Sequence, residues 1–323
     1  MLNIIKELCA LPPDGRGALE VLKKYSGRND SLRCDALGSV IWERGGQGSA
    51  LMLEAHLDTI AMVVTQVMDG GFLRVQPVGG VDRRPLPAAA VSVWGKKKLR
   101  GVIASVPPHL KEKNAPEVPE WDELLIDLGG DADGVSAGDL VSLYAPPLEL
   151  NGGCLSAAGL DNRIGCAAVL KALISCDEAI PVTAVFALRE ETSGAGALTA
   201  AFAGAARAAI AVDVSFAQSP EVSEREGGKL GGGVMLGVSP VLDGELTEHL
   251  RSLAREAEIP LQTEVMGGRT GTDADGIQTV RQGIPTALLS IPLRNMHTAA
   301  ELIRLEDAEN TARLLALAIT RGV

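Results

Sequence analysis

The chain has 323 residues, of which 46% are apolar and 22% charged, and its formal net charge at pH 7 is −11. This length is enough for one large domain or for two domains of ordinary size. The acidic balance argues against nucleic acid and anionic membranes as partners, because both bind a basic protein surface. No apolar run reaches the roughly 18 residues of a membrane-spanning helix, so we expect no membrane contact.

The cysteines are five in number and show no C-x-x-C spacing, which argues against a disulfide framework and against a thiolate zinc site. They are Cys9, Cys34, Cys154, Cys166 and Cys176. The start of the chain, "MLNIIKELCALPPDG", lacks the basic region, long apolar core and cleavage site of a signal peptide. We therefore expect a cytoplasmic protein.

The first part of the chain predicts two helices and then two strands. The expected ranges are 1–11 and 17–26 for the helices, and 38–43 and 50–56 for the strands. From 66 to 150, short β-branched runs divided by Gly and Pro predict a small all-β domain with a barrel-like or sandwich form. Within it, we expect the turn-rich segment 109–123 to be an exposed loop.

The last part of the chain alternates between helix and strand patterns. Helices are expected over 161–175, 195–204, 244–257, 273–281 and 306–320, and strands over 181–189, 207–214, 233–238 and 285–291. Such alternation predicts an α/β domain, with a mixed sheet that carries helices on both faces. Segments 1–65 and 151–323 together would form this domain, and 66–150 would be inserted between them.

Histidines and acidic residues recur where the predicted strands end. His56 and Asp58 lie in "LMLEAHLDT", and strand periodicity places their side chains on one face, where the acid can support the imidazole. The others are Glu190, Glu191, Asp213 and His297, together with Asp161 at the start of a helix. Each has an ordinary explanation alone, such as a helix cap or an exposed loop acid. Together they suit two divalent cations with mixed nitrogen and oxygen ligands.

These motifs resemble those of the tetrahedral aminopeptidase family, which includes glutamyl aminopeptidases and proteins once labelled endoglucanases. The matching stretches are "AHLDTIAMVV", "VPPHL", "AGLDNRIGCAAVL", "REETSGAGA", "AVDVS", "GTDADGIQTVRQGIPTALLSIPLRNMHT" and the closing "LEDAENTARLLAL". They follow the family order from about residue 50 to the end of the chain. The resemblance implies a metal-dependent aminopeptidase that removes N-terminal residues from short peptides.

The resemblance also implies two metal ions in each subunit, Zn²⁺ or Co²⁺, with Mn²⁺ as an alternative. Asp161 would bridge the two ions. His56 and Asp213 would complete one site, and Glu191 and His297 would complete the other.

By the same resemblance, Glu190 would be the general base and Asp58 would support His56. The inserted β domain would be a dimerisation domain, and dimers would build a dodecamer that encloses the active sites. The family's T-D-A segment matches Thr272 and Asp273, whose role is left open. His109 is either a residue near a neighbouring subunit's active site or a turn residue, and the Pro-rich context slightly favours the turn.

The chain departs from the family pattern at several positions, among them Thr59 in "HLDTIA", Ala195 in "EETSGAGA" and Asn295 in "RNMH". The family's N-terminal S-G-x-E pattern is also not clear around "PPDGRGALEVL". All the expected ligands and the base are retained. The departures therefore concern substrate preference and assembly more than metal binding.

Other classes of function remain open at this point. Paired carboxylates also serve glycoside hydrolases, but those enzymes need no cluster of histidines and acids. Sensitivity of the hydrolysis to a chelator separates the two classes. A metallocarboxypeptidase or deacylase would use a similar pair of metals, whereas a non-catalytic binding protein would be expected to lack a ligand or the base.

Overall fold

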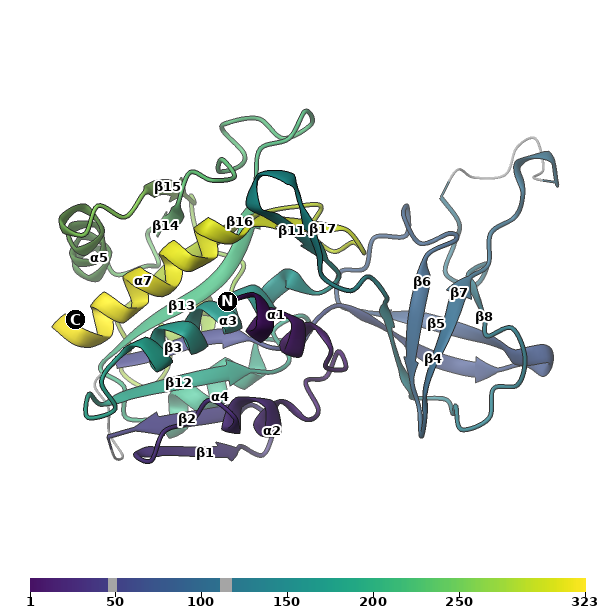
Figure 1. Cartoon of the computed structure of the whole chain (residues 1–323), viewed down its shortest axis with the longest axis horizontal. Coiled ribbons are helices and arrows are strands. Elements are labelled where there is room, and N and C mark those ends of the chain that lie inside the picture. Colours follow the sequence, from purple (N-terminus) through teal and green to yellow (C-terminus); the bar gives the residue numbers. More distant parts are fainter. Residues whose placement is uncertain (46–50, 111–117) are drawn as a thin grey trace.

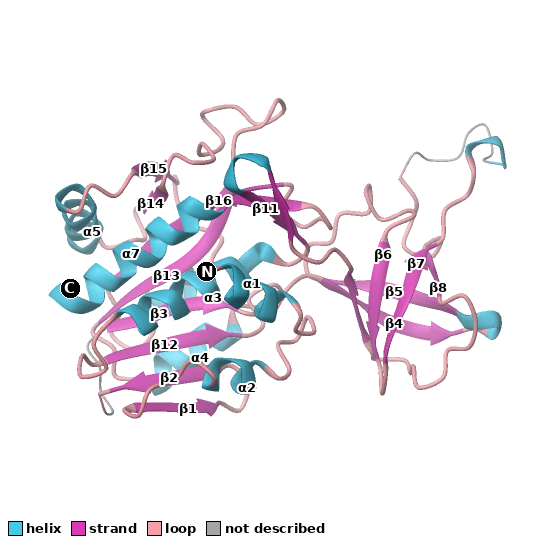
Figure 2. Ribbon diagram, in the orientation of Figure 1, coloured by secondary structure: helices cyan, strands magenta, loops and turns pink. Residues whose placement is uncertain are grey.

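The computed structural model describes residues 1–45, 51–110 and 118–323, and it has a larger α/β part and a smaller β barrel (Figure 1). Figure 2 shows helices along both faces of the larger sheet and only short helical turns around the barrel. The predicted fold class is therefore confirmed: a mixed sheet with helices, and a small closed all-β unit. Within the described ranges, no helix combines the length and apolar character that crossing a membrane requires.

The larger sheet has four parallel strands at its centre. Its main path runs β1 (Asp30–Cys34), β2 (Val40–Arg44), β12 (Val182–Ala187), β3 (Leu51–His56), β13 (Ala208–Phe216), β16 (Thr286–Arg294), β17 (Glu301–Arg304), β11 (Cys154–Ala157) and β10 (Leu148–Leu150). β14 (Val234–Val238) pairs with β16 and with β15 (Leu261–Val265). Strands β12, β3, β13 and β16 are mutually parallel, so their carboxyl ends meet at one edge. In open parallel sheets this edge is the usual place for ligands.

Helices cover both faces of this sheet. They are α1 (Leu2–Cys9), α2 (Ala18–Lys23), α3 (Leu160–Ser175), α4 (Ala195–Ala203), α5 (Gly244–Glu256), α6 (Ala274–Ile277) and α7 (Leu305–Arg321). On β3, Leu51 and Leu53 join the apolar core with α3 and α7, while Met52 joins the core with α4 and α6. Every residue of β3 is buried, so both faces of the strand are covered, as in other central parallel strands.

The barrel closes through antiparallel pairing in the order β4 (Ala61–Val67), β5 (Phe72–Val78), β8 (Leu125–Asp127), β7 (Lys98–Ile103), β6 (Ala90–Trp94) and β9 (Leu140–Leu143). Its interior is a separate apolar cluster. The barrel strands thus begin at Ala61, soon after His56, and β10 already belongs to the larger sheet. The division of the chain at 66 and 150, and a dimerising role for the insert, stay predictions.

Several elements were not expected from the sequence. β1 is half exposed and polar at the sheet edge, and β10, β11, β15 and β17 have three to five residues each, too short for a clear pattern. The helix expected over 273–281 is shorter, α6 alone. Of the expected loop 109–123, residues 111–117 lie outside the described part, and Pro108–Leu110 forms a 3₁₀ turn. Further 3₁₀ turns are Asp69–Gly71 and Asn151–Gly153, and all five cysteines are free.

A buried ion pair ties the outer strands to the core. Arg44 Nε lies 2.7 Å from Asp30 Oδ1, and both side chains are almost fully buried, with exposed fractions of 2% and 0%. Arg44 Nη1 also donates to the backbone carbonyl of Leu173, at the end of α3, at 2.7 Å. The pair therefore links β1, β2 and α3.

Replacing Arg44 by Met should lower the free energy of unfolding by about 3–5 kcal/mol, because Asp30 would stay buried without its partner. The matched control is Lys24→Met, which removes an exposed pair with Glu7 and should cost less than about 1 kcal/mol. Urea unfolding of both variants measures the difference. Equal, small losses would show that the Arg44 pair does not hold the strands.

Candidate metal and catalytic site

The sequence-predicted site residues converge at the carboxyl edge of the parallel strands. His56 ends β3, Asp213 lies near the end of β13, and His297 follows β16. Glu190 and Glu191 lie in the turn between β12 and α4. The register Ala187 to His56 places the Glu pair beside the end of β3. Segments far apart in the sequence therefore meet here because their strands are parallel neighbours.

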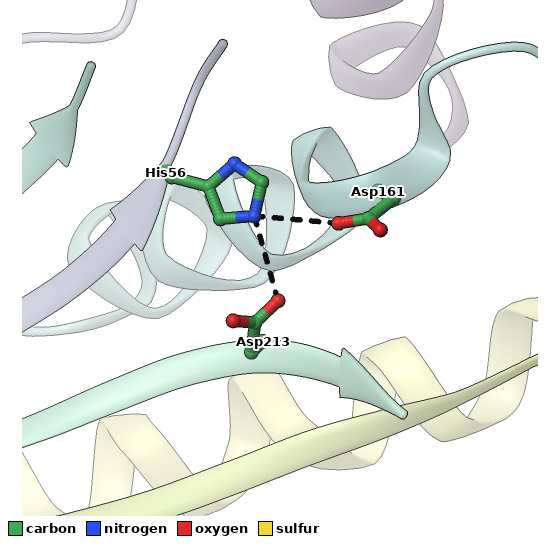
Figure 3. Close-up of side chains that lie close together, drawn as sticks. All are labelled: His56, Asp161 and Asp213. Atoms are coloured by element: carbon green, nitrogen blue, oxygen red, sulfur yellow. Dashed lines mark ion pairs between the residues drawn. The ribbon is translucent and has the colours of Figure 1, made fainter. Parts of the chain in front are cut away.

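The first group of candidate ligands is His56, Asp161 and Asp213 (Figure 3). His56 Nε2 lies 3.3 Å from Asp161 Oδ1 and 3.6 Å from Asp213 Oδ1, so one ring nitrogen faces two carboxylates. All three residues are buried. One nitrogen and two oxygens around a common point form a donor set that divalent transition metals accept.

The second group is Asp161, Glu191 and His297. His297 Nε2 lies 3.4 Å from Asp161 Oδ2 and 3.7 Å from Glu191 Oε2. Asp161 therefore faces His56 with one carboxylate oxygen and His297 with the other. A carboxylate shared in this way suits two neighbouring cations better than one.

Asp161 is not a helix cap. Gly159 is the residue that precedes α3, and Asp161 itself has the non-helical angles φ −74° and ψ 111° and is followed by a cis peptide bond to Asn162. Its backbone N–H donates to Glu301 at 3.1 Å, and the Asn162 side chain donates to the Val212 carbonyl at 2.7 Å. These bonds direct the Asp161 side chain to the strand edge.

Glu190 lies beside the first group but belongs to neither. Its Oε2 is 3.8 Å from His56 Nε2. Burial, with added repulsion from Asp213 and other acids, raises the pKa of Glu190 to about 8 although His56 opposes the shift. A carboxylate with a pKa near neutrality, outside the ligand groups, has the properties of a general base.

Asp58 contacts the Glu pair more directly than it contacts His56. Its carboxylate accepts the backbone N–H groups of Glu190 and Glu191 at 3.2 and 3.3 Å. The same carboxylate is 3.9 Å from His56 Nδ1, whereas the Asp58 backbone carbonyl is 3.1 Å from that nitrogen. Asp58 thus orients the ring through its main chain and holds the turn of the two glutamates with its side chain.

Glu301 was not predicted from the sequence, yet it links both halves of the site. It accepts the backbone N–H groups of Asp161 and His297, each at 3.1 Å. Burial, followed by the charge of Asp161, raises the pKa of Glu301 to about 8. Its place four residues after His297, in "HTAAEL", was the only signal, and an isolated acid there looks like a loop residue.

Two further buried acids, Glu54 and Asp273, lie close to the candidate ligands. Burial, followed by the charge of Asp273, raises the pKa of Glu54 well above its usual value. Burial also raises the pKa of Asp273 to about 7. Glu54 was missed because it reads as one polar residue in an apolar strand.

The charges of this cluster are unbalanced within the protein. Burial opposes ionisation of Asp161, but hydrogen bonds with His297 and His56 lower its pKa to about 2. Burial, followed by the charge of Asp161, raises the pKa of Glu191 to about 7. Buried carboxylates that lack a partner are costly, and bound cations would offset that cost. The donor types, their burial and the shared Asp161 therefore fit two divalent cations.

Thr59, Ala195 and Asn295, which depart from the family pattern, each lie within four residues of a candidate site residue along the chain. Thr59 is buried and would contact a side chain added at Gly159, and Ala195 begins α4. Asn295 has a positive φ of 57°, and its side-chain amide donates to the Ala300 carbonyl at 3.0 Å.

His109 is exposed on the 3₁₀ turn that follows β7.

The α/β fold with its inserted barrel and the two ligand groups define the class of the tetrahedral aminopeptidases. The model of the M42 glutamyl aminopeptidase family matches residues 38–314, so the chain belongs to this family of peptidases. Family membership confirms the resemblance seen in the sequence.

Individual relatives agree with this assignment. The chain is 33% identical to a lysyl aminopeptidase of Pyrococcus furiosus over 92% of its own length and 88% of that protein. An aminopeptidase of Desulfurococcus kamchatkensis superposes with a TM-score of 0.91 at 31% identity, covering 99% of this chain and 94% of that one. The TET1 peptidase of Pyrococcus horikoshii superposes with a TM-score of 0.86 at 29% identity, covering 98% of both chains. That protein is described as assembling into a tetrahedron or a large octahedral shell.

The metal-free protein should become less stable as the pH rises from about 6 to 8.5. In the folded state, burial raises the pKa values of Glu191, Glu190 and Glu301 to about 7, 8 and 8. Because these acids ionise more easily in the unfolded chain, the folded state loses stability as the pH rises through these values. His297 acts in the same direction, because hydrogen bonding with Asp161 raises its pKa to about 9. In chelator, the Tm should fall by about 3 °C or more over this range.

Glu301→Gln provides the internal comparison, because removing one ionising group should make the pH dependence shallower. Saturating Zn²⁺ should also reduce the fall, since a bound ion favours the ionised ligands. A Tm in chelator that rises over the same pH range would contradict this electrostatic description.

Proposed function

We propose that the protein is a metal-dependent aminopeptidase that removes N-terminal residues from short peptides. The observation that carries the proposal is the pair of ligand groups that share Asp161, with Glu190 beside them and outside both. Membership of the M42 family supports the peptidase class, and the names of the relatives support action at the amino terminus.

Two divalent cations, Zn²⁺ or Co²⁺ with Mn²⁺ as the alternative, are the proposed cofactors. His56, Asp161 and Asp213 would hold one, and Asp161, Glu191 and His297 would hold the other. When bound, such cations supply Lewis acidity, which polarises a peptide carbonyl and makes a water molecule more acidic.

The chain's own residues then handle the proton. Glu190 Oε2 takes the proton of the attacking water and passes it to the nitrogen of the leaving amine. The Asp58 carboxylate fixes the position of Glu190 through its backbone N–H. Glu301 holds Asp161 and His297 in register through theirs. Because these supports are buried, they limit the motion of the groups that contact substrate.

Self-association into dimers, and of dimers into a dodecamer, is part of the proposal. The described assemblies of the Pyrococcus horikoshii relative support it. Exposed apolar side chains on or next to the barrel, at Val102, Val106, Leu110 and Tyr144, are suitable for burial between subunits. A cytoplasmic location remains the expectation from the cysteine pattern.

Glu190→Gln should lower kcat by about 10²–10⁴-fold and leave the bound metal unchanged, because the amide cannot accept the proton. Asp161→Asn should instead lose metal, since both ligand groups need its carboxylate. Glu224→Gln, which alters an exposed glutamate, is the control and should retain full activity.

Hydrolysis of aminoacyl chromogenic substrates and elemental metal analysis of the three variants provide the two readouts. Full activity in Glu190→Gln would refute its role as the base. Unchanged metal content in Asp161→Asn would refute the shared site.

A further inference from the structure

A cavity of about 550 Å³ opens directly beside the candidate catalytic site. Asp58 and Glu191 line it, so it adjoins one candidate metal ligand and the residue that positions the two glutamates. Its other walls come from residues 13–19, the turn before β2, the end of β12 and three barrel residues, Ala61, Val78 and Leu140. A cavity of this size accommodates a ligand of drug or short-peptide dimensions.

Most charged groups of this cavity already have partners. Arg16 Nε lies 2.6 Å from Asp14 Oδ2. The Asp58 carboxylate accepts two backbone N–H groups, and Glu191 accepts the backbone N–H of Ile60 at 3.2 Å. Arg189 also lines the cavity, and among the described residues no carboxylate lies within ion-pair distance of its guanidinium.

The backbone around Arg189 is fixed although its side chain is exposed. The Arg189 carbonyl accepts the N–H groups of Ser193 at 2.9 Å and Gly194 at 2.8 Å, which closes the turn that carries the two glutamates. The residue has a positive φ of 71°. The backbone that carries the Arg189 cation is therefore fixed at the cavity wall, one residue from the proposed base.

We propose that Arg189 makes this cavity a subsite for a carboxylate carried by the peptide substrate. Guanidinium groups bind carboxylates through two parallel hydrogen bonds, which gives both affinity and orientation. The carboxylate would be either an acidic side chain or the C-terminus of a short peptide. This inference rests on the proposed peptidase function, and it makes Arg189 a specificity-determining residue.

The test compares peptides that share N-terminal leucine. Leu-Ala-Ala against its C-terminal amide tests the chain end, and amidated Leu-Glu-Ala against amidated Leu-Gln-Ala tests the side chain. For at least one pair, the wild-type protein should prefer the carboxylate form by about tenfold in kcat/KM. Arg189→Gln should remove that preference, with a larger loss of kcat/KM for the carboxylate peptides than for the amidated neutral peptides.

Arg207→Gln is the matched control, because it removes an exposed arginine that does not line the cavity. It should keep the wild-type preference. Calorimetric titration of the same peptides into metal-loaded Glu190→Gln protein, with and without Arg189→Gln, measures binding without turnover. It therefore tests the subsite even if the peptidase proposal fails.

Absence of a carboxylate preference in the wild-type protein, in both hydrolysis and binding, would overturn the proposal. An equal loss for carboxylate and amide peptides in Arg189→Gln would also overturn it, because that result indicates a structural role for Arg189.

Discussion

The structure depends on a cluster of carboxylates at one buried edge of the sheet. Gathering these carboxylates there has an electrostatic free-energy cost. Asp161, Asp213 and Glu191 surround two histidines, and Glu190 and Glu301 lie close behind them. Such a cluster is unfavourable unless protons or cations neutralise it. Burial among other acids raises the pKa values of Glu190, Glu191 and Glu301. Hydrogen bonds with the two histidines keep the pKa of Asp161 low. Two divalent cations would relieve the same cost and supply the chemistry of peptide hydrolysis.

The inserted barrel also contributes to the site's geometry. His297 Nδ1 lies 2.9 Å from the carbonyl of Gly80, in the segment that follows β5. The backbone N–H of Ile60, just before β4, donates to Glu191. Two members of the second ligand group, His297 and Glu191, are therefore hydrogen-bonded to backbone segments that lead into or out of barrel strands. A change that shifts the barrel should alter the geometry around His297 and Glu191 first.

The sequence was sufficient to predict the central strands and the residues they bring together. His56, Asp213 and His297 each end or follow a strong apolar run, and the carboxyl ends of parallel strands must meet. Support contacts were harder to predict. Glu301 acts through two backbone N–H groups that are far apart in the sequence. The Asp58 side chain bonds the turn of the two glutamates, while its backbone carbonyl contacts the His56 ring. Such contacts depend on tertiary placement, which local periodicity does not encode.

The most direct test of the central claim is anomalous X-ray diffraction from crystals of the protein grown with Zn²⁺, with data collected at the zinc absorption edge. The account predicts two peaks in each subunit. One should lie among His56, Asp161 and Asp213, and the other among Asp161, Glu191 and His297. They should be about 3.5–4 Å apart, as in co-catalytic metal pairs. A single peak away from Asp161, or no peak at this edge of the sheet, would contradict the account.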